Sequence, residues 1–300
     1  MTIHLRTVVT GCFVAAVVGL APATRAQAHD DPQVETGPDF QLSETRQTGQ
    51  RQRGPELEHG TTDYRGVSAF FNVREAYSNV RQGEWELEFS FEWETESEGD
   101  DDFEMAQSVK YGFTDDFHIE LEIEQPGIGD GGGSGAGESS LTLFYNCTKE
   151  QDRMPAVGSY IKGRFPTGDG SAGVDVTFGT AITKSITDDL RLHLGGFLTS
   201  ANGHIGEEDQ DGQRRPFQWG AGLGFDYRVS GQTLVGLNYL NRVNHERGHP
   251  NQNLLELELV QDIGRFGGAE HEIKVAADFG LDGHESTPNA AIRIQWAIEW

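Results

Sequence analysis

The sequence predicts an all-β protein, a 12-stranded antiparallel transmembrane β-barrel with short periplasmic turns and longer extracellular loops. Two observations lead to this prediction: a hydropathy period of two from residue 84 to the end of the chain, and connections that alternate in length. The mean hydropathy of −0.52 excludes a bundle of membrane helices, each of which needs about 20 mostly apolar residues. It does not exclude barrel strands, because these are apolar on one face only. A soluble β-sandwich also alternates and is the competing fold.

The first segment shows the alternation most clearly. Apolar side chains occupy every second position from Trp85 to Trp93, and glutamates fill most of the positions between them. Because alternate side chains of a strand point to opposite faces, one face is apolar and the other acidic. The same pattern predicts strands at 84–93, 103–113, 117–124, 139–148, 156–165, 173–183, 190–199, 217–228, 233–242, 253–262, 270–279 and 289–300.

The connections between these strands fall into two sets. Those at 94–102, 125–138, 166–172, 200–216, 243–252 and 280–288 are mostly longer than those at 114–116, 149–155, 184–189, 229–232 and 263–269. An even strand count with alternating long and short connections is typical of outer-membrane barrels, whose short turns lie in the periplasm. Both chain ends are then periplasmic.

The residues before the barrel form two parts. Residues 1–28 have a basic residue, Arg6, an apolar run at 7–21 and an Ala26-Gln27-Ala28 site, which together indicate a secretory signal peptide. Residues 29–83 form a leader whose first half is polar and nearly free of large apolar residues. Its apolar positions between 67 and 80 fit a short helix, a plug or an extra strand. Residues 84–300 form the barrel domain.

Several short motifs resemble known barrels. The final segment, from Ile292 to Trp300, resembles the last-strand signal of bacterial outer-membrane proteins, in which a terminal aromatic residue is recognised by the insertion machinery. The chain also resembles the barrel family associated with the meta-pathway of phenol degradation, through Gly83-Glu84-Trp85-Glu86-Leu87-Glu88, Tyr111-Gly112-Phe113-Thr114-Asp115-Asp116, Phe165-Pro166-Thr167-Gly168-Asp169, Thr187-Asp188-Asp189-Leu190 and the strand from Trp219 to Tyr227. This resemblance implies a Gram-negative outer-membrane transporter in contact with outer-membrane lipid and lipopolysaccharide. It implies no defined site residues.

The inward faces of the predicted strands carry the charges. The candidate lumen-lining residues are Glu86, Glu88, Glu120, Glu122, Glu256, Glu258 and Glu272, the cations Lys110, Arg191, Arg228, Lys274 and Arg293, and the small residues Gly220, Gly222 and Gly224. Closure of the last strand on the first gathers the acidic columns on one side. Two interpretations remain open: a wet lumen whose charges are merely solvated, and an interior that focuses its field to favour cations. The glycines leave room for a permeant or for the N-terminal segment.

These features predict a passive outer-membrane channel or uptake pore for small solutes with an acidic, cation-preferring lumen. The alternatives are a non-transporting structural or surface-interaction barrel and, less well supported, an outer-membrane lipid-modifying enzyme. The net charge of −25 argues against a nucleic-acid partner, which requires a basic face.

No catalytic residue, metal ligand or cofactor is predicted. The run from His245 to His249 fits H-E-x-x-H, but Gly248 and Pro250 oppose the helix that a zinc site of this kind needs. The acidic loop at 207–212 begins like a calcium loop, yet Gln218 replaces the glutamate that would close it. We expect this loop and residues 94–102 to form an acidic rim that holds divalent ions loosely.

Overall fold

The computed structural model describes residues 66–95, 102–125, 137–167, 173–201, 215–244, 247–282 and 289–300. The signal peptide, most of the leader, His245, Glu246 and the acidic loop at 207–212 lie outside these residues. The described residues form β1 (Trp85–Thr95), β2 (Asp102–Thr114), β3 (Phe117–Gln125), β4 (Ser139–Thr148), β5 (Ala156–Phe165), β6 (Asp175–Ser185), β7 (Leu190–Ser200), β8 (Phe217–Arg228), β9 (Thr233–Arg242), β10 (Gln252–Phe266), β11 (Ala269–Gly280) and β12 (Ala290–Glu299).

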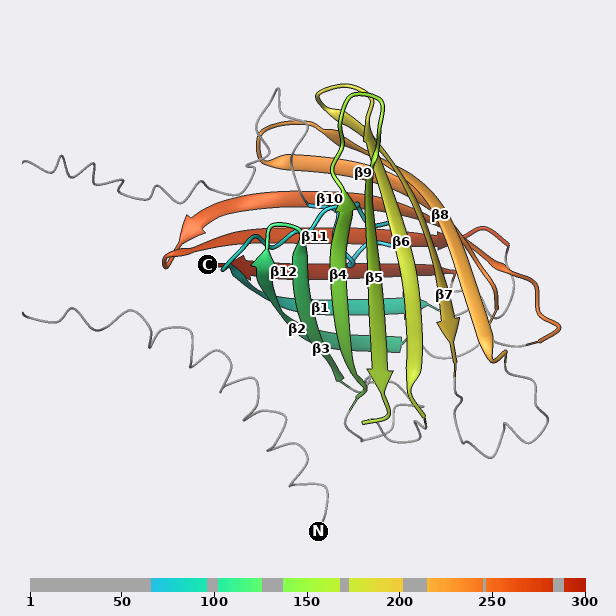
Figure 1. Cartoon of the computed structure of the whole chain (residues 1–300). Helices are drawn as coiled ribbons and strands as arrows, with labels where there is room; N and C mark the ends of the chain where they lie inside the picture. Colours follow the sequence, from blue (N-terminus) through green and yellow to red (C-terminus); the bar gives the residue numbers. More distant parts are fainter. Residues whose placement is uncertain are drawn as a thin grey trace, which may run out of the picture. The chain divides into compact units, whose positions relative to one another are not determined.

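These strands form one closed barrel in which each strand pairs with its neighbours in the sequence and β1 pairs with β12 (Figure 1). The closing pair is antiparallel, like the others, and runs from Glu86 opposite Glu299 to Thr95 opposite Ala290. Trp85 and Trp300 extend it with two backbone hydrogen bonds of 3.0 Å. Closure leaves no sheet edge and excludes the β-sandwich. We call the two ends of the barrel the Trp300 end and the Thr95 end.

The barrel exposes apolar side chains and buries polar ones, which is the opposite of the distribution in a soluble domain. On β8, Leu223, Phe225 and Tyr227 are exposed on the outer face, whereas Asp226 and Arg228 are buried in the interior. Large apolar side chains are exposed on every strand except β3, where they are half-buried. A surface band of this extent on a closed barrel is too large for a soluble monomer.

All 12 strands lie at the predicted places to within a few residues, and the largest difference is in one connection. Residues 263–269 were expected to be a turn, but β10 continues to Phe266. A bulge between Asp262 and Gly264 shifts the register, and the chain then reverses through Gly267 and Gly268, both with positive φ. Glycine adopts this left-handed conformation without strain, so two residues suffice for the turn.

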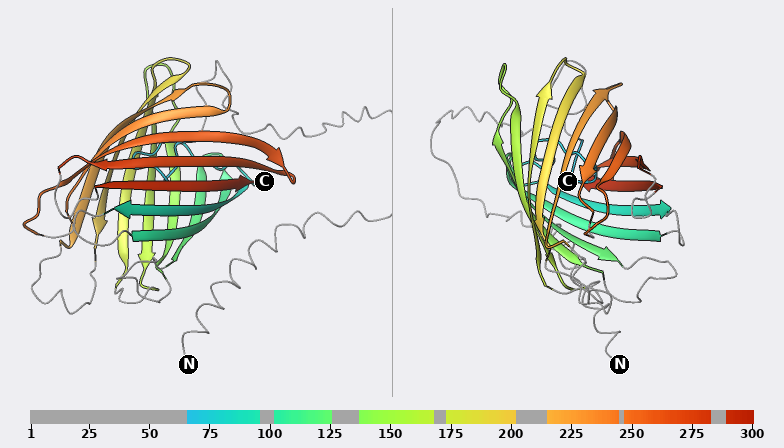
Figure 2. Two further views of the ribbon diagram at one scale, coloured as in Figure 1. Left: turned by 180° about the vertical axis from the view of Figure 1, so that it is seen from behind. Right: turned by 90° about the vertical axis from the view of Figure 1, so that its right-hand side faces the viewer.

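The described part of the leader, residues 66–83, lies inside the barrel (Figures 1 and 2). Residues 66–83, which we call the inner segment, contain no helix and no strand. Val67 and Phe71 pack against Leu234, Val260 and Ala276 of the wall to form the main apolar cluster of the interior. Of the three possibilities expected for this region, the described residues form neither the short helix nor the extra strand. No helix in the described residues is long and apolar enough to cross a membrane.

Candidate functional site

The inner segment is fixed to the wall by a fully buried ion-pair cluster. The guanidinium of Arg191 on β7 donates to Glu75 of the inner segment at 2.8 Å and to Asp226 of β8 at 2.7 Å. His193 lies 2.7 Å from the same Asp226 carboxylate. No side chain in this cluster is more than 1% exposed. Because each charge lies beside an opposite charge, burial costs less than it would for an isolated ion.

Polar wall residues also satisfy the irregular backbone of the inner segment. Thr183 accepts a hydrogen bond of 2.9 Å from the Ala76 amide, and Asn146 donates one of 2.7 Å to the Ala76 carbonyl. The Asn72 amide donates to Glu256 at 2.9 Å. A segment without helix or strand bonds needs such partners when it is buried. The inner segment is therefore held by side chains from several separate strands.

Glycines of the wall make room for the inner segment. A Cβ atom on Gly222 would lie 2.5 Å from the side chain of Val73, and one on Gly158 would lie 2.5 Å from the Ala76 carbonyl oxygen. The other two predicted lumen glycines have different neighbours: a Cβ on Gly220 would meet the Phe197 ring, and one on Gly224 would meet Asn238. Of the two uses expected for these glycines, Gly222 provides space for the chain's own segment.

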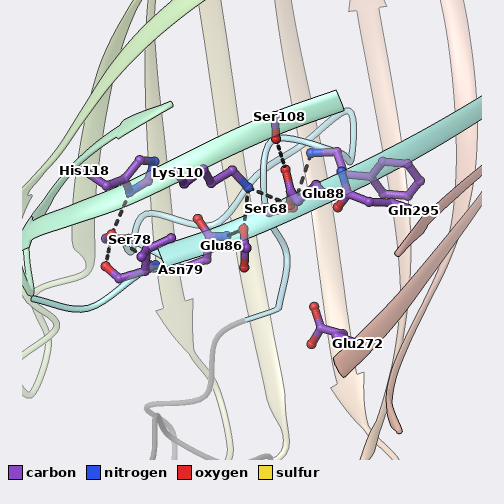
Figure 3. A network of polar contacts seen from close by, with 12 residues as sticks. Ser68, Ser78, Asn79, Glu86, Glu88, Ser108, Lys110, His118, Glu272 and Gln295 are labelled. Carbon is purple, nitrogen blue, oxygen red and sulfur yellow. Dashed lines mark hydrogen bonds and ion pairs between the residues drawn. The ribbon is translucent and has the colours of Figure 1, made fainter. Parts of the chain in front are cut away.

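A second buried network lies on the acidic side of the barrel (Figure 3). Lys110 on β2 lies between two glutamates of β1, at 2.7 Å from Glu86 and 2.6 Å from Glu88. Ser108 donates to Glu88 at 2.6 Å, and Asn79 of the inner segment donates to Glu86 at 2.7 Å. The acidic column of β1 is thus neutralised here by protein groups rather than by water alone.

Lys274 of β11 extends this network. Its ammonium lies 3.4 Å from Glu88, 3.3 Å from Glu272 and 3.2 Å from the hydroxyl of Ser68 in the inner segment. Lys110 and Lys274 together therefore contact three carboxylates of β1 and β11. We call this part of the interior, at the Trp300 end, the filled part, because the inner segment and its buried ion pairs occupy it.

A cavity of about 410 Å³ lies on the other side of the inner segment, toward the Thr95 end. Residues 69–72 and Arg74 contribute its floor, and the seven strands from β1 to β7 together with β12 contribute its wall. Its carboxylates are Glu88, Glu92, Glu104, Glu120, Glu122 and Glu124. Its cations are Arg74, Lys162 and Arg293. Carboxylates therefore outnumber cations two to one around this cavity.

Two of the three cations are bound to carboxylates. Lys162 donates to Glu122 at 2.7 Å. Arg293 pairs with Glu256, donates to Asp278 at 3.0 Å and donates to the carbonyl of Phe70 at 2.6 Å. Arg293 thereby joins β12 to the inner segment at the edge of the cavity.

Arg74 differs from the other two cations. Its guanidinium carbon lies 4.2 Å from the centre of the Phe144 ring and 5.2 Å from that of Tyr160, but within the described part of the chain it makes no hydrogen bond or ion pair. Its Nε atom is buried without a partner. Burial lowers the pKa of Arg74, and nearby negative charges, including that of Glu120, oppose this shift.

The remaining predicted lumen residues also lie on the inner face. Arg228 donates to Asp189 at 2.8 Å and to the Asp188 carbonyl at 2.6 Å, at the Trp300 end. Glu258 accepts a hydrogen bond from Asn238.

The sequence analysis did not predict Arg74, Glu75 and Tyr160 as site residues. The sequence does contain a feature that points to the first two: Arg74 and Glu75 are charged residues within the apolar stretch between 67 and 80.

No group of three or more metal-ligating side chains occurs among the described residues. Of the H-E-x-x-H run, only Arg247, Gly248 and His249 belong to those residues. In the inner segment, burial, followed by the charge of Glu150, raises the pKa of Tyr77 to about 12.

A closed 12-stranded barrel with an apolar outer face and a charged interior is the architecture of outer-membrane β-barrel proteins. Two of the solved structures with a similar fold are described as a channel and a porin. The COG4313 outer membrane channel from Pseudomonas putida F1 matches with a TM-score of 0.55 and 15% identity, over 75% of this chain and 98% of that one. The NanC porin matches with a TM-score of 0.51 and 12% identity, over 70% of this chain and 98% of that one. No protein-family model and no curated protein sequence matches the chain.

Proposed function

We propose that the protein is a passive outer-membrane channel for small solutes and that the acidic cavity makes it prefer cations. The observation on which this rests is the cavity of about 410 Å³, around which six carboxylates face three cations, two of them already paired. Carboxylates in a low-dielectric wall focus a negative potential on the solution they enclose. The similar solved structures are a channel and a porin by their descriptions, which agrees with this proposal.

The proposed location is the outer membrane, after cleavage of the signal peptide near Ala28. It is supported by the exposed apolar band, which includes Trp93, Phe178, Leu194 and Trp296 and suits contact with lipid and lipopolysaccharide. Insertion would use the terminal strand that ends at Trp300. The association with phenol degradation stays a prediction from the sequence resemblance.

The test is the reversal potential of the refolded protein in a planar bilayer under a KCl gradient. We expect cation preference, and a reversal potential that moves toward zero in the double variant Glu120→Gln/Glu124→Gln. Both residues line the cavity. A matched control, Asp152→Asn/Glu270→Gln, removes two carboxylates outside the cavity and should leave the reversal potential unchanged.

Anion preference, or equal shifts of the reversal potential in both double variants, would overturn the proposal of a cation-preferring lumen.

The second candidate function is that of a non-transporting structural barrel. One observation favours it: the inner segment crosses the interior and is fixed to opposite walls at Glu86 and Arg191. Absence of conductance in correctly folded protein would support that candidate and overturn the channel.

A further inference from the structure

Arg74 is a buried cation that makes no hydrogen bond with the residues that the structure describes. It is 8% exposed, its Nε has no partner, and no carboxylate of the described residues forms an ion pair with it. Contacts with the rings of Phe144 and Tyr160 offset only part of the cost of burying a guanidinium. A guanidinium presents a planar fork of donors that fits a carboxylate in a bidentate manner. This group is therefore suited to bind an anionic oxygen pair in the cavity.

Glu120 is the complementary group in the same cavity. It lies on β3, is 5% exposed, and makes no hydrogen bond or ion pair with the described residues. Lys110, opposite Glu120 on β2, is bound to Glu86 and Glu88 instead. Arg74 and Glu120 thus line one cavity with opposite charges that are not joined to each other.

We propose that this cavity binds a small zwitterion, such as an amino acid, with its carboxylate on Arg74 and its ammonium on Glu120. The surrounding glutamates would repel a simple anion before it reached Arg74, and a simple cation would leave Arg74 without a partner. A zwitterion satisfies both groups and adds no net charge. The volume of about 410 Å³ is sufficient for a molecule of this size.

The inference rests on the proposed channel function, because it names the solute class, but it is tested by binding rather than by conduction. The probes are glycine, 4-aminobutyrate and 6-aminohexanoate, which differ in the separation of their charges. Butyrate and butylammonium each carry one of the two charges. In isothermal titration calorimetry of the folded full-length protein in detergent, we expect at least one zwitterion to bind about tenfold more tightly than either single-charge probe.

Variants assign the two ends of the ligand. Glu120→Gln should lower zwitterion affinity about tenfold without weakening butyrate binding, whereas Arg74→Met should lower zwitterion affinity without weakening butylammonium binding. Asp152→Asn, which alters a residue outside the cavity, is the control and should change neither affinity. If Arg74→Met fails to fold, Arg74→Lys decides: it keeps the charge without the planar fork, and we expect weaker zwitterion binding.

Equal affinities for zwitterions and single-charge probes, or zwitterion binding that survives both Glu120→Gln and the Arg74 variant, would overturn this inference. A protein that conducts ions but binds no zwitterion would overturn the inference and leave the channel intact. A protein that binds zwitterions without conducting would overturn the channel and support the site.

Discussion

The two parts of the barrel interior treat charge differently. In the filled part at the Trp300 end, Lys110, Arg191 and Lys274 are almost fully buried, and each contacts two carboxylates. In the cavity, Arg293 contacts two carboxylates, Lys162 contacts one, and Arg74 contacts none within the described residues. The paired charges at the Trp300 end fix the inner segment to the wall, whereas Arg74 and Glu120, which form no ion pair with the described residues, face the space that a solute would occupy. The lumen thus divides into a structural and a functional part.

The largest effect should come from breaking the filled part. Arg191→Met keeps a long side chain but leaves the carboxylates of Glu75 and Asp226 without their shared cation. Removing one partner of a buried ion pair costs about 3–5 kcal/mol. We expect a loss of that size in the free energy of unfolding, measured by urea titration of the protein in lipid vesicles.

The matched control is Arg164→Met. Arg164 also contacts two carboxylates, Glu138 and Asp175, but its side chain is 45% exposed. Exposed pairs contribute about 0–1 kcal/mol, so this variant should be almost as stable as the unaltered protein. Similar losses in the two variants would contradict the division of the lumen into two parts.

The strands could be predicted because a barrel imposes one simple rule on the sequence. Every second side chain must be apolar outside and polar inside, so the alternation around Trp85 or Phe225 directly gives strand position and register. The prediction of a strand end was wrong where a bulge interrupts the alternation. At Gly264 a bulge adds one residue, and the pattern no longer distinguishes strand from turn.

The inner segment could not be predicted in the same way. It has no regular hydrogen bonds, so its apolar residues follow no period; Phe71 faces one wall and Val73 approaches Gly222 on another. The sequence indicates which charges point inward, but it does not indicate which ones meet. Glu88 and Glu120 look alike in the pattern, yet Glu88 contacts Lys110 and Lys274, and Glu120 contacts neither. That distinction depends on distances across the barrel.

The next effect should come from the fit between the inner segment and β8. In Gly222→Ala the added Cβ would lie 2.5 Å from Val73, so the inner segment must shift. Overpacking of this kind costs about 1–3 kcal/mol. We expect that loss in the urea titration, together with faster proteolysis of the inner segment.

Gly195→Ala is the control for this prediction. Gly195 lies opposite Gly222 on β7 and faces the same Val73, but there the added Cβ would lie 3.6 Å away, an ordinary contact. The control should therefore lose little stability. A Gly222→Ala protein that is as stable as Gly195→Ala would show that the inner segment is not held against β8.

The smallest effect should come from the cavity wall. Lys162→Met removes the 2.7 Å ion pair with Glu122, whose partners are 33% and 23% exposed. Water can replace the ammonium there, and Glu122 keeps its 3.1 Å hydrogen bond from Ser140. We expect a change of less than about 1 kcal/mol in the free energy of unfolding.

The Lys162→Met variant also removes a positive charge from the cavity, so its reversal potential under a KCl gradient should indicate a stronger preference for cations. This shift should shrink as KCl rises from 0.01 to 0.1 M, because the Debye length falls from about 30 Å to about 10 Å. A loss of stability as large as that of Arg191→Met, without a change in selectivity, would mean that the cavity charges are structural like those of the filled part.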